Sequence, residues 1–408
     1  MCFTLLPDSA ITRTGSRYLA SGHILNTTTS ISLLPSYENQ DKIFSSAFSI
    51  LREAIAERAF PAASVAISHQ DRLVALRAFG QFVYETDLGA PLLANFARSG
   101  NYDVTPATLF DLASLTKVVT TTVMAMILYE RGLVELDAPV MGIIPEFRSS
   151  SDPRRDDVTF RMLLAHSSGL PAYEKLFLRA RTRDELLRIA FTMPLAANPG
   201  TRAEYSDIGF IILGAALERL AEESLDRFCQ REVFGPLAMT HTTFNPPAEM
   251  RAQIPPTADD RSFRNRIIQG EVQDENAFVL GGVAGHAGLF STAEDIARCA
   301  HAMLNGGRPI LRPETLSLFT RRESAPAGTS RALGFDTPSA PSQSGKYFSA
   351  SSFGHLGYTG TSLWIDPERQ ISITLLTNRT WPDCWNQAIK QVRPKFHDAA
   401  LEVVLESA

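Results

Sequence analysis

The sequence predicts a mixed α/β fold with an additional all-α lobe. Two runs of high β-propensity lie near the start of the chain, at 62–80, and two more near its end, at 361–378. Helical patterns dominate residues 155–235 between them. Strands at both ends and helices in the middle indicate one antiparallel sheet built from the two ends of the chain. Terminal helices would flank this sheet, and a helical lobe would be inserted into it.

The first predicted elements are a helix and a hairpin. Residues 40–59 carry apolar side chains at helical spacing, which predicts an amphipathic helix. In residues 62–80, two β-prone runs surround the polar residues Gln70 and Asp71. This pattern predicts a β-hairpin that turns at the two polar residues.

Helices are expected through the middle of the chain. A mostly apolar helix over 108–132 ends at Gly132, where a C-cap glycine is typical. Further helical patterns follow at 158–166, 183–191, 207–225 and 291–304. The last of these begins at Ser291 or Thr292, either of which can be its N-cap.

The end of the chain returns to strands. Residues 322–350 are rich in Pro, Ser and Gly, which predicts a loop. Two strands follow at 361–378 around a proline-containing turn. The chain should close with a helix over 385–407 that is interrupted near Pro394.

The bulk composition excludes several classes of function. The chain has 408 residues, a formal net charge of −5 and dispersed basic residues, so nothing favours binding to nucleic acid. No run of about 18 or more apolar residues is present to span a membrane. The four cysteines are far apart and form no cluster with histidine, which argues against a zinc site. No metal or organic cofactor is implied.

Residues 1–35 are rich in Ser and Thr, and their first basic residue is Arg13. They lack the charged start and apolar run of a secretory signal peptide. We therefore expect a flexible N-terminal segment and a cytoplasmic protein. The alternative is a wrongly assigned start site, in which case the protein would be periplasmic.

Ser114 and Lys117 form a Ser-x-x-Lys pair at the start of a predicted helix. Residues at i and i+3 share a helix face, so the hydroxyl lies beside the amine. Serine is a poor nucleophile until a base takes its proton, and an amine can be that base when burial lowers its pKa. The helix N-terminus adds positive potential that favours a developing oxyanion. Alone the pair is a weak signal, because chance matches to so short a pattern are common.

Tyr205 is the second candidate. It follows a Pro/Gly turn and precedes a strongly apolar helix in the segment PGTRAEYSDIG. A phenol near Lys117 can relay a proton from the attacking serine to the leaving group. The structural alternative is a simple helix start with Asp207 as the N-cap.

Two histidines are candidates for substrate binding. His355 stands at the start of a strand rich in Gly and Thr, whose backbone N–H groups are open to a closely approaching ligand. The alternative for this residue is a surface histidine without a functional role. His286 lies in a Gly-rich loop before a helix and ranks second, and no Gly-Lys-Ser/Thr follows to make that loop a phosphate cradle.

Signatures of other enzymes are absent. The chain has no Gly-x-Ser-x-Gly element, which argues against an α/β-hydrolase. It also has no His-Glu-x-x-His and no Gly-x-Gly-x-x-Gly after a strand.

Three short motifs occur in a fixed order. They are Ser114-x-x-Lys117, Tyr205-Ser206-Asp207 and His355-Leu356-Gly357. Together they resemble the signature of the penicillin-recognising serine hydrolases, the superfamily of serine β-lactamases and penicillin-binding proteins. That superfamily holds class C β-lactamases, DD-peptidases and related esterases. The segments that support the resemblance are LLAHSSGLP (163–171), PGTRAEYSD (199–207), GHAGLFSTAEDIA (285–297) and GYTGTSLWIDP (357–367).

The resemblance runs from about residue 45 to the C-terminus and implies a domain organisation. Residues 36–408 would form one β-lactamase-related catalytic domain after the segment 1–35. Its sheet lobe would take residues 36–110 and 350–408, and its helical lobe residues 111–349. The family fold, an antiparallel sheet flanked by helices with an all-helical lobe, agrees with the layout above.

The resemblance also implies a role for each matching residue. Ser114 would be the acylated nucleophile, and Lys117 and Tyr205 would share the general base and acid work. Which of these two is the base in acylation stays open, since coupled groups share their titration. The backbone N–H groups of Ser114 and Tyr358 would form the oxyanion hole.

Departures from the family pattern narrow the expected substrate. Asp207 stands where the second motif usually ends in Asn. An ionised carboxylate accepts but does not donate hydrogen bonds, so it would hold Lys117 protonated and bind an acylamide carbonyl poorly. His355 replaces the lysine of many lactam-binding relatives, and its charge at neutral pH is not fixed. Leu356 replaces a hydroxyl residue and cannot hydrogen-bond a carboxylate. Asp207, His355 and Gly357 are nevertheless expected to line the substrate site.

These features predict a serine hydrolase that forms an acyl-enzyme on Ser114. We expect a β-lactamase-like esterase that acts on small esters or amides. One alternative is a β-lactamase or a D-amino-acid-specific peptidase such as a DD-carboxypeptidase. A further alternative is a catalytically silent homologue that binds peptidoglycan fragments or a partner protein. The expected partner is a small-molecule ester, amide or lactam, and no sequence pattern specifies an oligomeric state.

Overall fold

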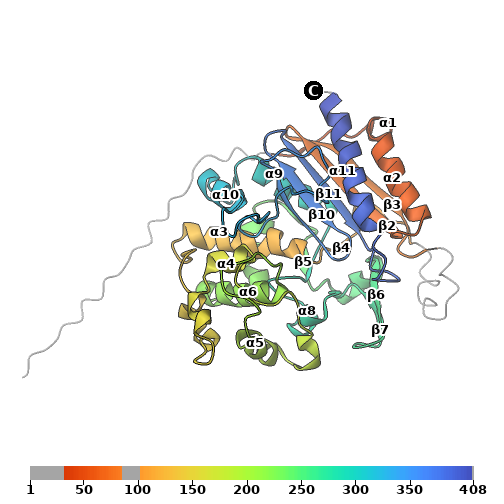
Figure 1. Ribbon diagram of the computed structural model, residues 1–408. Helices are drawn as coiled ribbons and strands as arrows, with labels where there is room; N and C mark the ends of the chain where they lie inside the picture. The colour runs from red at the N-terminus through yellow and green to blue at the C-terminus, as the bar shows by residue number, and fades with distance from the viewer. Residues whose placement is uncertain (1–31, 85–101, 407–408) are drawn as a thin grey trace, which may run out of the picture. The chain divides into compact units, whose positions relative to one another are not determined.

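A six-stranded sheet built from both ends of the chain forms the centre of the fold (Figure 1). The computed structural model describes residues 32–84 and 102–406. The strands, in their order across the sheet, are β1 (Leu34–Pro35), β3 (Arg72–Gly80), β2 (Ala62–His69), β11 (Ile371–Thr377), β10 (Ser362–Asp366) and β9 (Phe353–Leu356). All neighbours are antiparallel except β1 and β3, which are parallel. The predicted antiparallel sheet from two chain ends is confirmed.

The first hairpin turns where the sequence predicted. Gln70 and Asp71 join β2 to β3 with φ values of 47° and 63°. Two successive residues with positive φ match the twist of the flanking strands, which is why such turns are common in hairpins. Strand β11 pairs with β2 from Ala63 to His69 and so joins the C-terminal strands to this hairpin.

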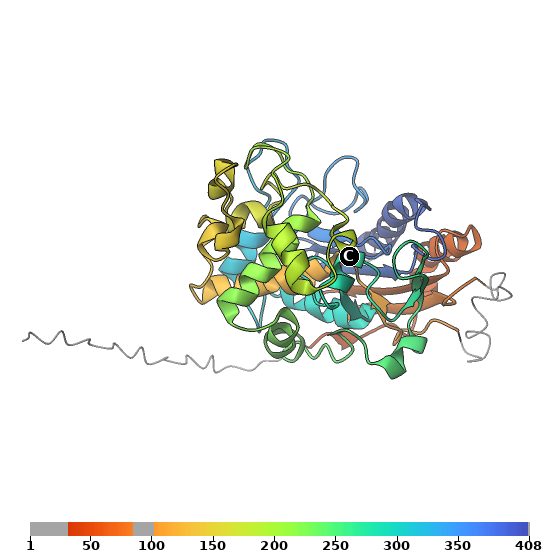
Figure 2. The ribbon, with the colours of Figure 1, turned by 90° about the horizontal axis from the view of Figure 1, so that it is seen from below.

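Helices from the two ends of the chain cover one face of the sheet. They are α1 (Gln40–Ile43), α2 (Ser45–Ala56) and α11 (Ile389–Glu406). Helices α2 and α11 pack against each other, side by side in Figures 1 and 2. The predicted helix 40–59 is therefore two helices, which meet at Phe44 and end at Ala56.

The predicted interruption near Pro394 is wrong, because α11 continues through this residue. Proline removes one helical hydrogen bond and disfavours a helix interior. Helix α11 nevertheless buries a stripe of side chains that includes Phe396, Ala400 and Leu401. Tertiary packing of such a face provides most of the stability of a helix in a protein, so it outweighs the local cost of proline.

Helix α9 (Ala293–Leu304) packs against β2, β10 and β11. The Thr292 hydroxyl accepts a hydrogen bond from the Asp295 N–H group at 3.2 Å, so Thr292 is the N-cap. The prediction of a helix that begins after Ser291 or Thr292 is confirmed.

The helical lobe surrounds α6 (Asp207–Ala221), whose residues are apolar on nearly every side and mostly buried. Helices α3, α4, α5 and α7 pack against it, as the green and orange ribbons of Figure 2 show. The bounds of the remaining helices are α3 (Thr122–Glu130), α4 (Phe160–Leu164), α5 (Arg183–Phe191), α7 (Leu225–Cys229), α8 (Glu275–Val279) and α10 (Pro313–Thr320). Two small sheets complete the lobe, β4 (Phe110–Asp111) with β8 (Leu289–Ser291) and β5 (Thr243–Phe244), and β6 (Pro256–Asp260) with β7 (Arg266–Gln269).

The helix predicted over 108–132 starts later than its apolar pattern suggested. Phe110 and Asp111 form β4, because their backbone groups pair with β8. The helix proper consists of a π-helical turn at Lys117–Thr121 followed by α3. Gly132, with a φ of 71°, lies just beyond its end, as a C-cap glycine does.

Two other expectations concern irregular segments. Between α10 and β9, the described chain has no helix or strand, which agrees with the predicted loop over 322–350. The flexible segment predicted over 1–35 lies outside the described residues as far as residue 31.

Within residues 32–84 and 102–406, no helix is both long and apolar enough to cross a membrane.

We expect Phe48→Ala to lower the free energy of unfolding by about 3–5 kcal/mol, because it leaves a cavity between α2 and the sheet. The Phe48 side chain is fully buried, and its ring centroid lies 5.2 Å from that of Phe79. Urea unfolding followed by circular dichroism measures the effect. Phe48→Leu should lower the free energy of unfolding much less. Equal losses of this free energy in the two variants would contradict this account of the packing.

Candidate active site

Ser114 follows a sharp turn that begins at the end of β4. The Asp111 carboxylate accepts a hydrogen bond from the Ala113 N–H group at 2.8 Å, and Ala113 has a left-handed φ of 47°. Such a conformation costs free energy for a non-glycine residue, and the Asp111 contact holds it in place. Burial raises the pKa of Asp111 to about 6, although N–H groups of Ala113 and Gln273 oppose this. The turn delivers Ser114 to the start of the helix that carries Lys117.

The structure brings Ser114, Lys117 and Tyr205 together. The Lys117 ammonium donates to Ser114 Oγ at 3.0 Å, and Tyr205 Oη donates to the same oxygen at 2.6 Å. The nucleophile predicted from sequence is therefore within direct proton-transfer distance of both predicted acid–base groups.

Lys117 is fully buried and surrounded by three acceptors. Besides Ser114 Oγ, its Nζ atom donates to Asp207 Oδ1 at 2.7 Å and to the main-chain oxygen of His286 at 2.9 Å. Three acceptors match the three N–H bonds of an ammonium group. Burial lowers the pKa of Lys117, but the neighbouring Asp207 carboxylate and Tyr205 together outweigh burial and hold the pKa above its usual value.

Asp207 is a partner of Lys117 rather than a helix cap. The N-cap of α6 is Ser206, whose hydroxyl accepts a hydrogen bond from the Gly209 N–H group at 3.0 Å. Asp207 is the first residue inside α6, where the helix dipole favours a carboxylate. The structural alternative considered for Asp207 is therefore wrong.

Aromatic and cationic side chains surround the Tyr205 ring. The ring centroids of His166 and His355 lie 4.7 Å and 5.8 Å from it, and the guanidinium carbon of Arg331 lies 5.6 Å away. Burial and the Asp207 charge raise the pKa of Tyr205 to about 12, against the effect of Lys117. The phenol is therefore protonated at neutral pH and able to donate to Ser114.

His355 is a buried, neutral histidine, so the alternative of a surface residue is wrong. Its side chain is 3% exposed, and its Nδ1 atom lies 2.7 Å from the main-chain oxygen of Leu356. That oxygen only accepts, so Nδ1 carries the proton and Nε2 is a bare acceptor, without a partner among the described residues. Burial, with the nearby charges of Lys117 and Arg331, holds the pKa of His355 well below its usual range.

His286 enters the site through its backbone, not its side chain. Its main-chain oxygen binds Lys117, whereas its Nε2 atom lies 2.9 Å from Asp274 Oδ1. Although burial opposes it, this contact holds the pKa of Asp274 below its usual value. From its sequence context, His286 ranks behind His355 as a candidate for substrate binding. In the structure its side chain pairs with Asp274 instead, and its main-chain oxygen binds Lys117.

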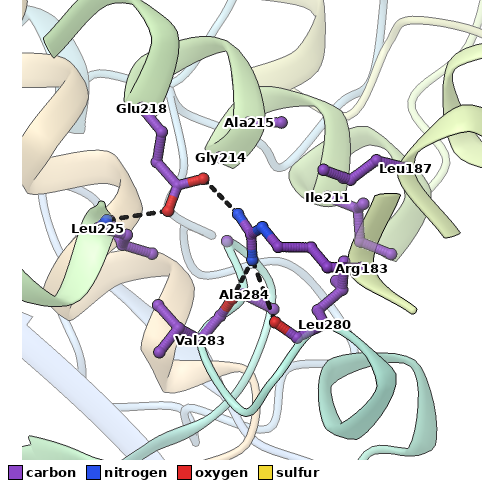
Figure 3. Close-up of a pocket in the computed structure, with 11 residues that line it drawn as sticks. Arg183, Leu187, Ile211, Gly214, Ala215, Glu218, Leu225, Leu280, Val283 and Ala284 are labelled. Carbon is purple, nitrogen blue, oxygen red and sulfur yellow. Dashed lines mark hydrogen bonds and ion pairs between the residues drawn. The ribbon is translucent and has the colours of Figure 1, made fainter. Parts of the chain in front are cut away.

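Arg183 binds the backbone of the loop that carries His286. As Figure 3 shows, the Arg183 guanidinium donates to the main-chain oxygens of Leu280 and Val283 and contacts Glu218. Glu218 also accepts a hydrogen bond from the Leu225 N–H group. Residues 280 and 283–285 of this loop line the pocket in Figure 3, and neither Ser114 nor Lys117 lines it.

The two predicted oxyanion-hole donors are available. The N–H groups of Ser114 and Tyr358 have no hydrogen-bond partner within the part of the chain that the structure describes. The Thr359 hydroxyl donates to the main-chain oxygen of Asp111 at 2.7 Å, which attaches the Tyr358 turn to strand β4 before Ser114. At Gly357, a Cβ atom would lie 1.9 Å from Thr361 Oγ1, so no side chain fits there.

Sequence reasoning gave no role to three residues of the site, His166, Asp274 and Arg331. His166 lies in the segment LLAHSSGLP, which supported the family resemblance, and this was the one available signal. Arg331 lies in the predicted loop 322–350, where no motif marks it.

In residues 32–84 and 102–406, no group of three or more His, Cys, Asp or Glu side chains is arranged to hold a metal ion.

Comparisons with known proteins agree on one family. A family model described as Beta-lactamase matches residues 48–391. The N-acetylmuramyl-L-alanine amidase of Bacillus subtilis (strain 168) is 32% identical over 353 residues, 78% of this chain and 77% of that protein. A putative D-alanyl-D-alanine carboxypeptidase of Escherichia coli (strain K12) is 33% identical over 304 residues, 67% of this chain and 70% of that protein.

Solved structures share the fold. EstCE1, described as a hydrolase with promiscuous acyltransferase activity, matches with a TM-score of 0.70 and 21% identity. The match covers 88% of this chain and 99% of that chain. The predicted β-lactamase/transpeptidase-like fold is confirmed, and the chain belongs to the β-lactamase family of serine hydrolases.

Proposed function

We propose that this enzyme cleaves small esters or amides through an acyl-enzyme on Ser114. One observation carries the proposal, namely that Ser114 Oγ lies 3.0 Å from Lys117 Nζ and 2.6 Å from Tyr205 Oη. Both neighbours are general acid–base groups, and the N–H groups of Ser114 and Tyr358, which have no partner in the described part of the chain, can bind an oxyanion.

In acylation, Ser114 Oγ attacks the substrate carbonyl and its proton passes to the Lys117–Tyr205 pair. The reactive form has Lys117 as a neutral amine that has lost one proton to solvent and still donates to Asp207 and to the main-chain oxygen of His286. Its lone pair then faces Ser114 and accepts the hydroxyl proton. Tyr205 gives its proton to the leaving group and takes back the one that Lys117 received from Ser114, and the same groups activate water to release the acyl product.

The preferred substrate in this proposal is an ester or amide without a required carboxylate. His355 offers a bare Nε2 atom, which repels an anion, and Leu356 offers no hydroxyl. Asp207, a carboxylate near Ser114, also disfavours an anionic substrate on that side. EstCE1, which shares the fold, is a hydrolase with acyltransferase activity.

A second candidate is a peptidase for substrates with a free carboxylate, and Arg331 favours it. The Arg331 guanidinium lies beside the Tyr205 ring, and its described ion pair, with Asp336, is long at 3.8 Å. A guanidinium with unused donors is a good carboxylate partner. The relatives named as carboxypeptidase and amidase support this candidate.

A fluorophosphonate probe should add one adduct to the wild-type protein and none to Ser114→Ala, because only an activated serine reacts. Intact-mass spectrometry measures the adduct, with a penicillin tested in parallel. Ser64→Ala is a matched control, since Ser64 is buried and its hydroxyl has no described partner. Labelling with the phosphonate alone supports the esterase, and labelling with both reagents supports lactam recognition. Absence of any adduct would contradict the proposal.

We expect Asp207→Asn to shift the acidic limb of the kcat/KM profile to lower pH by about one unit or more. Asp207 raises the pKa of Lys117, and the free amine is needed to accept the serine proton, so loss of the carboxylate makes the amine available at lower pH. Initial rates with an aryl ester across the pH range measure the shift. Glu275→Gln removes a nearby carboxylate that does not contact Lys117 and should leave the profile in place. An unmoved profile in Asp207→Asn would exclude Lys117 as the titrating base.

Arg331→Met distinguishes the two substrate classes. If a substrate carboxylate binds Arg331, kcat/KM for a D-alanyl-D-alanine peptide should fall by about 10-fold to 100-fold, the value of a charged hydrogen bond. The rate with a neutral aryl ester should change by less than about threefold. Arg331→Lys keeps the charge and should recover part of the peptide activity. An equal loss for both substrates would contradict a carboxylate-binding role.

A further inference from the structure

Arg393 is a buried cation whose described partners are all uncharged. Its side chain extends from α11 and is 4% exposed. It donates to the main-chain oxygens of Gly357 at 2.7 Å, Thr361 at 2.8 Å and Gly360 at 3.3 Å. A fourth contact goes to the side-chain oxygen of Gln343 at 2.9 Å. No carboxylate lies within ion-pair distance of Arg393 among the described residues.

Burying a cation without a counter-charge is costly, so its retention needs a compensating interaction. Burial lowers the pKa of Arg393 to about 9, which still leaves the group charged at neutral pH. The compensating interaction is with the carbonyl groups of the turn 357–361.

The oxygen of Gly357 belongs to the same peptide unit as the N–H group of Tyr358. This peptide is trans, so its C=O and N–H bonds point in opposite directions. Arg393 binds the oxygen end, and the N–H end is the free donor that the proposed oxyanion hole uses. The cation and the donor are therefore linked through a single peptide group.

A cation at the oxygen end increases the polarity of a peptide group. Hydrogen bonds in series polarise one another, and the effect is larger where water is excluded. The Tyr358 N–H group then carries more positive charge and binds a developing oxyanion more strongly. The same contact fixes the direction of the N–H bond, because the peptide is planar.

We propose that Arg393 is a positioning residue of the oxyanion hole, which it orients and polarises through the Gly357–Tyr358 peptide. The inference rests on the proposed acyl-enzyme function. A second buried cation, Arg379, holds the next peptide by donating to the Tyr358 oxygen at 2.7 Å. Two carbonyl oxygens of the turn thus bind cations, whereas the Tyr358 N–H group has no partner among the described residues.

Arg393→Gln should reduce kcat for a short aryl ester by about 10-fold to 100-fold, less than the loss of a whole oxyanion donor, with KM within about threefold of wild type. Infrared spectroscopy of the acyl-enzyme gives a direct readout with a carbon-13-labelled carbonyl. A weaker oxyanion hole polarises this carbonyl less, so its stretching frequency should rise in the variant.

Arg155→Gln is the matched control. Arg155 is 2% exposed and donates to the main-chain oxygens of Phe147, Phe191 and Met193 in the helical lobe. Its loss removes a comparable buried cation without touching the turn 357–361. The control should lose stability but keep kcat and the acyl carbonyl frequency of the wild type.

A second variant, Arg393→Lys, tests the same inference if Arg393→Gln does not fold. A lysine buried without a counter-charge has a strongly lowered pKa, so this variant should lose kcat and raise the carbonyl frequency as pH increases. A pH profile and carbonyl frequency that match the wild type would overturn the inference, as would equal behaviour of Arg393→Gln and Arg155→Gln. Both outcomes leave the proposed function intact, which fails only if wild-type Ser114 forms no acyl adduct.

Discussion

The ion pair between Lys117 and Asp207 is the interaction on which the rest of the site depends. A fully buried ammonium is unstable without compensation, and here a carboxylate, a hydroxyl and a main-chain oxygen surround it. Each acceptor comes from a different segment: Ser114 from the turn after β4, Asp207 from the start of α6, and His286 from the Gly-rich loop. The charge of Lys117 therefore holds these three segments of the lobe together around Ser114.

Buried cations bound to backbone carbonyls recur in this protein. Arg155, Arg379 and Arg393 each donate to several main-chain oxygens, those of Arg379 and Arg393 in irregular turns and those of Arg155 at or just beyond the ends of short helices. Such oxygens need donors once they are removed from water. A guanidinium supplies up to five donors from one side chain, so a single residue can satisfy a whole irregular turn.

Regular elements and motif residues were predictable from the sequence, and their tertiary neighbours were not. The hairpin at Gln70 and Asp71 and the helix after Thr292 depend on local chemistry, namely a polar turn and an N-cap. The apolar pattern over 108–132 misled the prediction of where its helix starts, because Phe110 and Asp111 pair instead with β8, which is distant in sequence. Arg331 reaches Tyr205 from a loop without a motif, and His166 from a segment that supported the resemblance but indicated no role for this residue, so only the fold places them there.

The assembly of the sheet from both ends of the chain has a consequence for biosynthesis. Ser114 lies in the first third of the sequence, whereas Tyr358 and Arg393 lie in its last part, and β11 must insert between β2 and β10. A nascent chain that has released Ser114 from the ribosome therefore still lacks the turn 357–361 and three strands of the sheet. The six-stranded sheet can be completed only after β11 has been synthesised, so an incomplete translation product lacks the folded site.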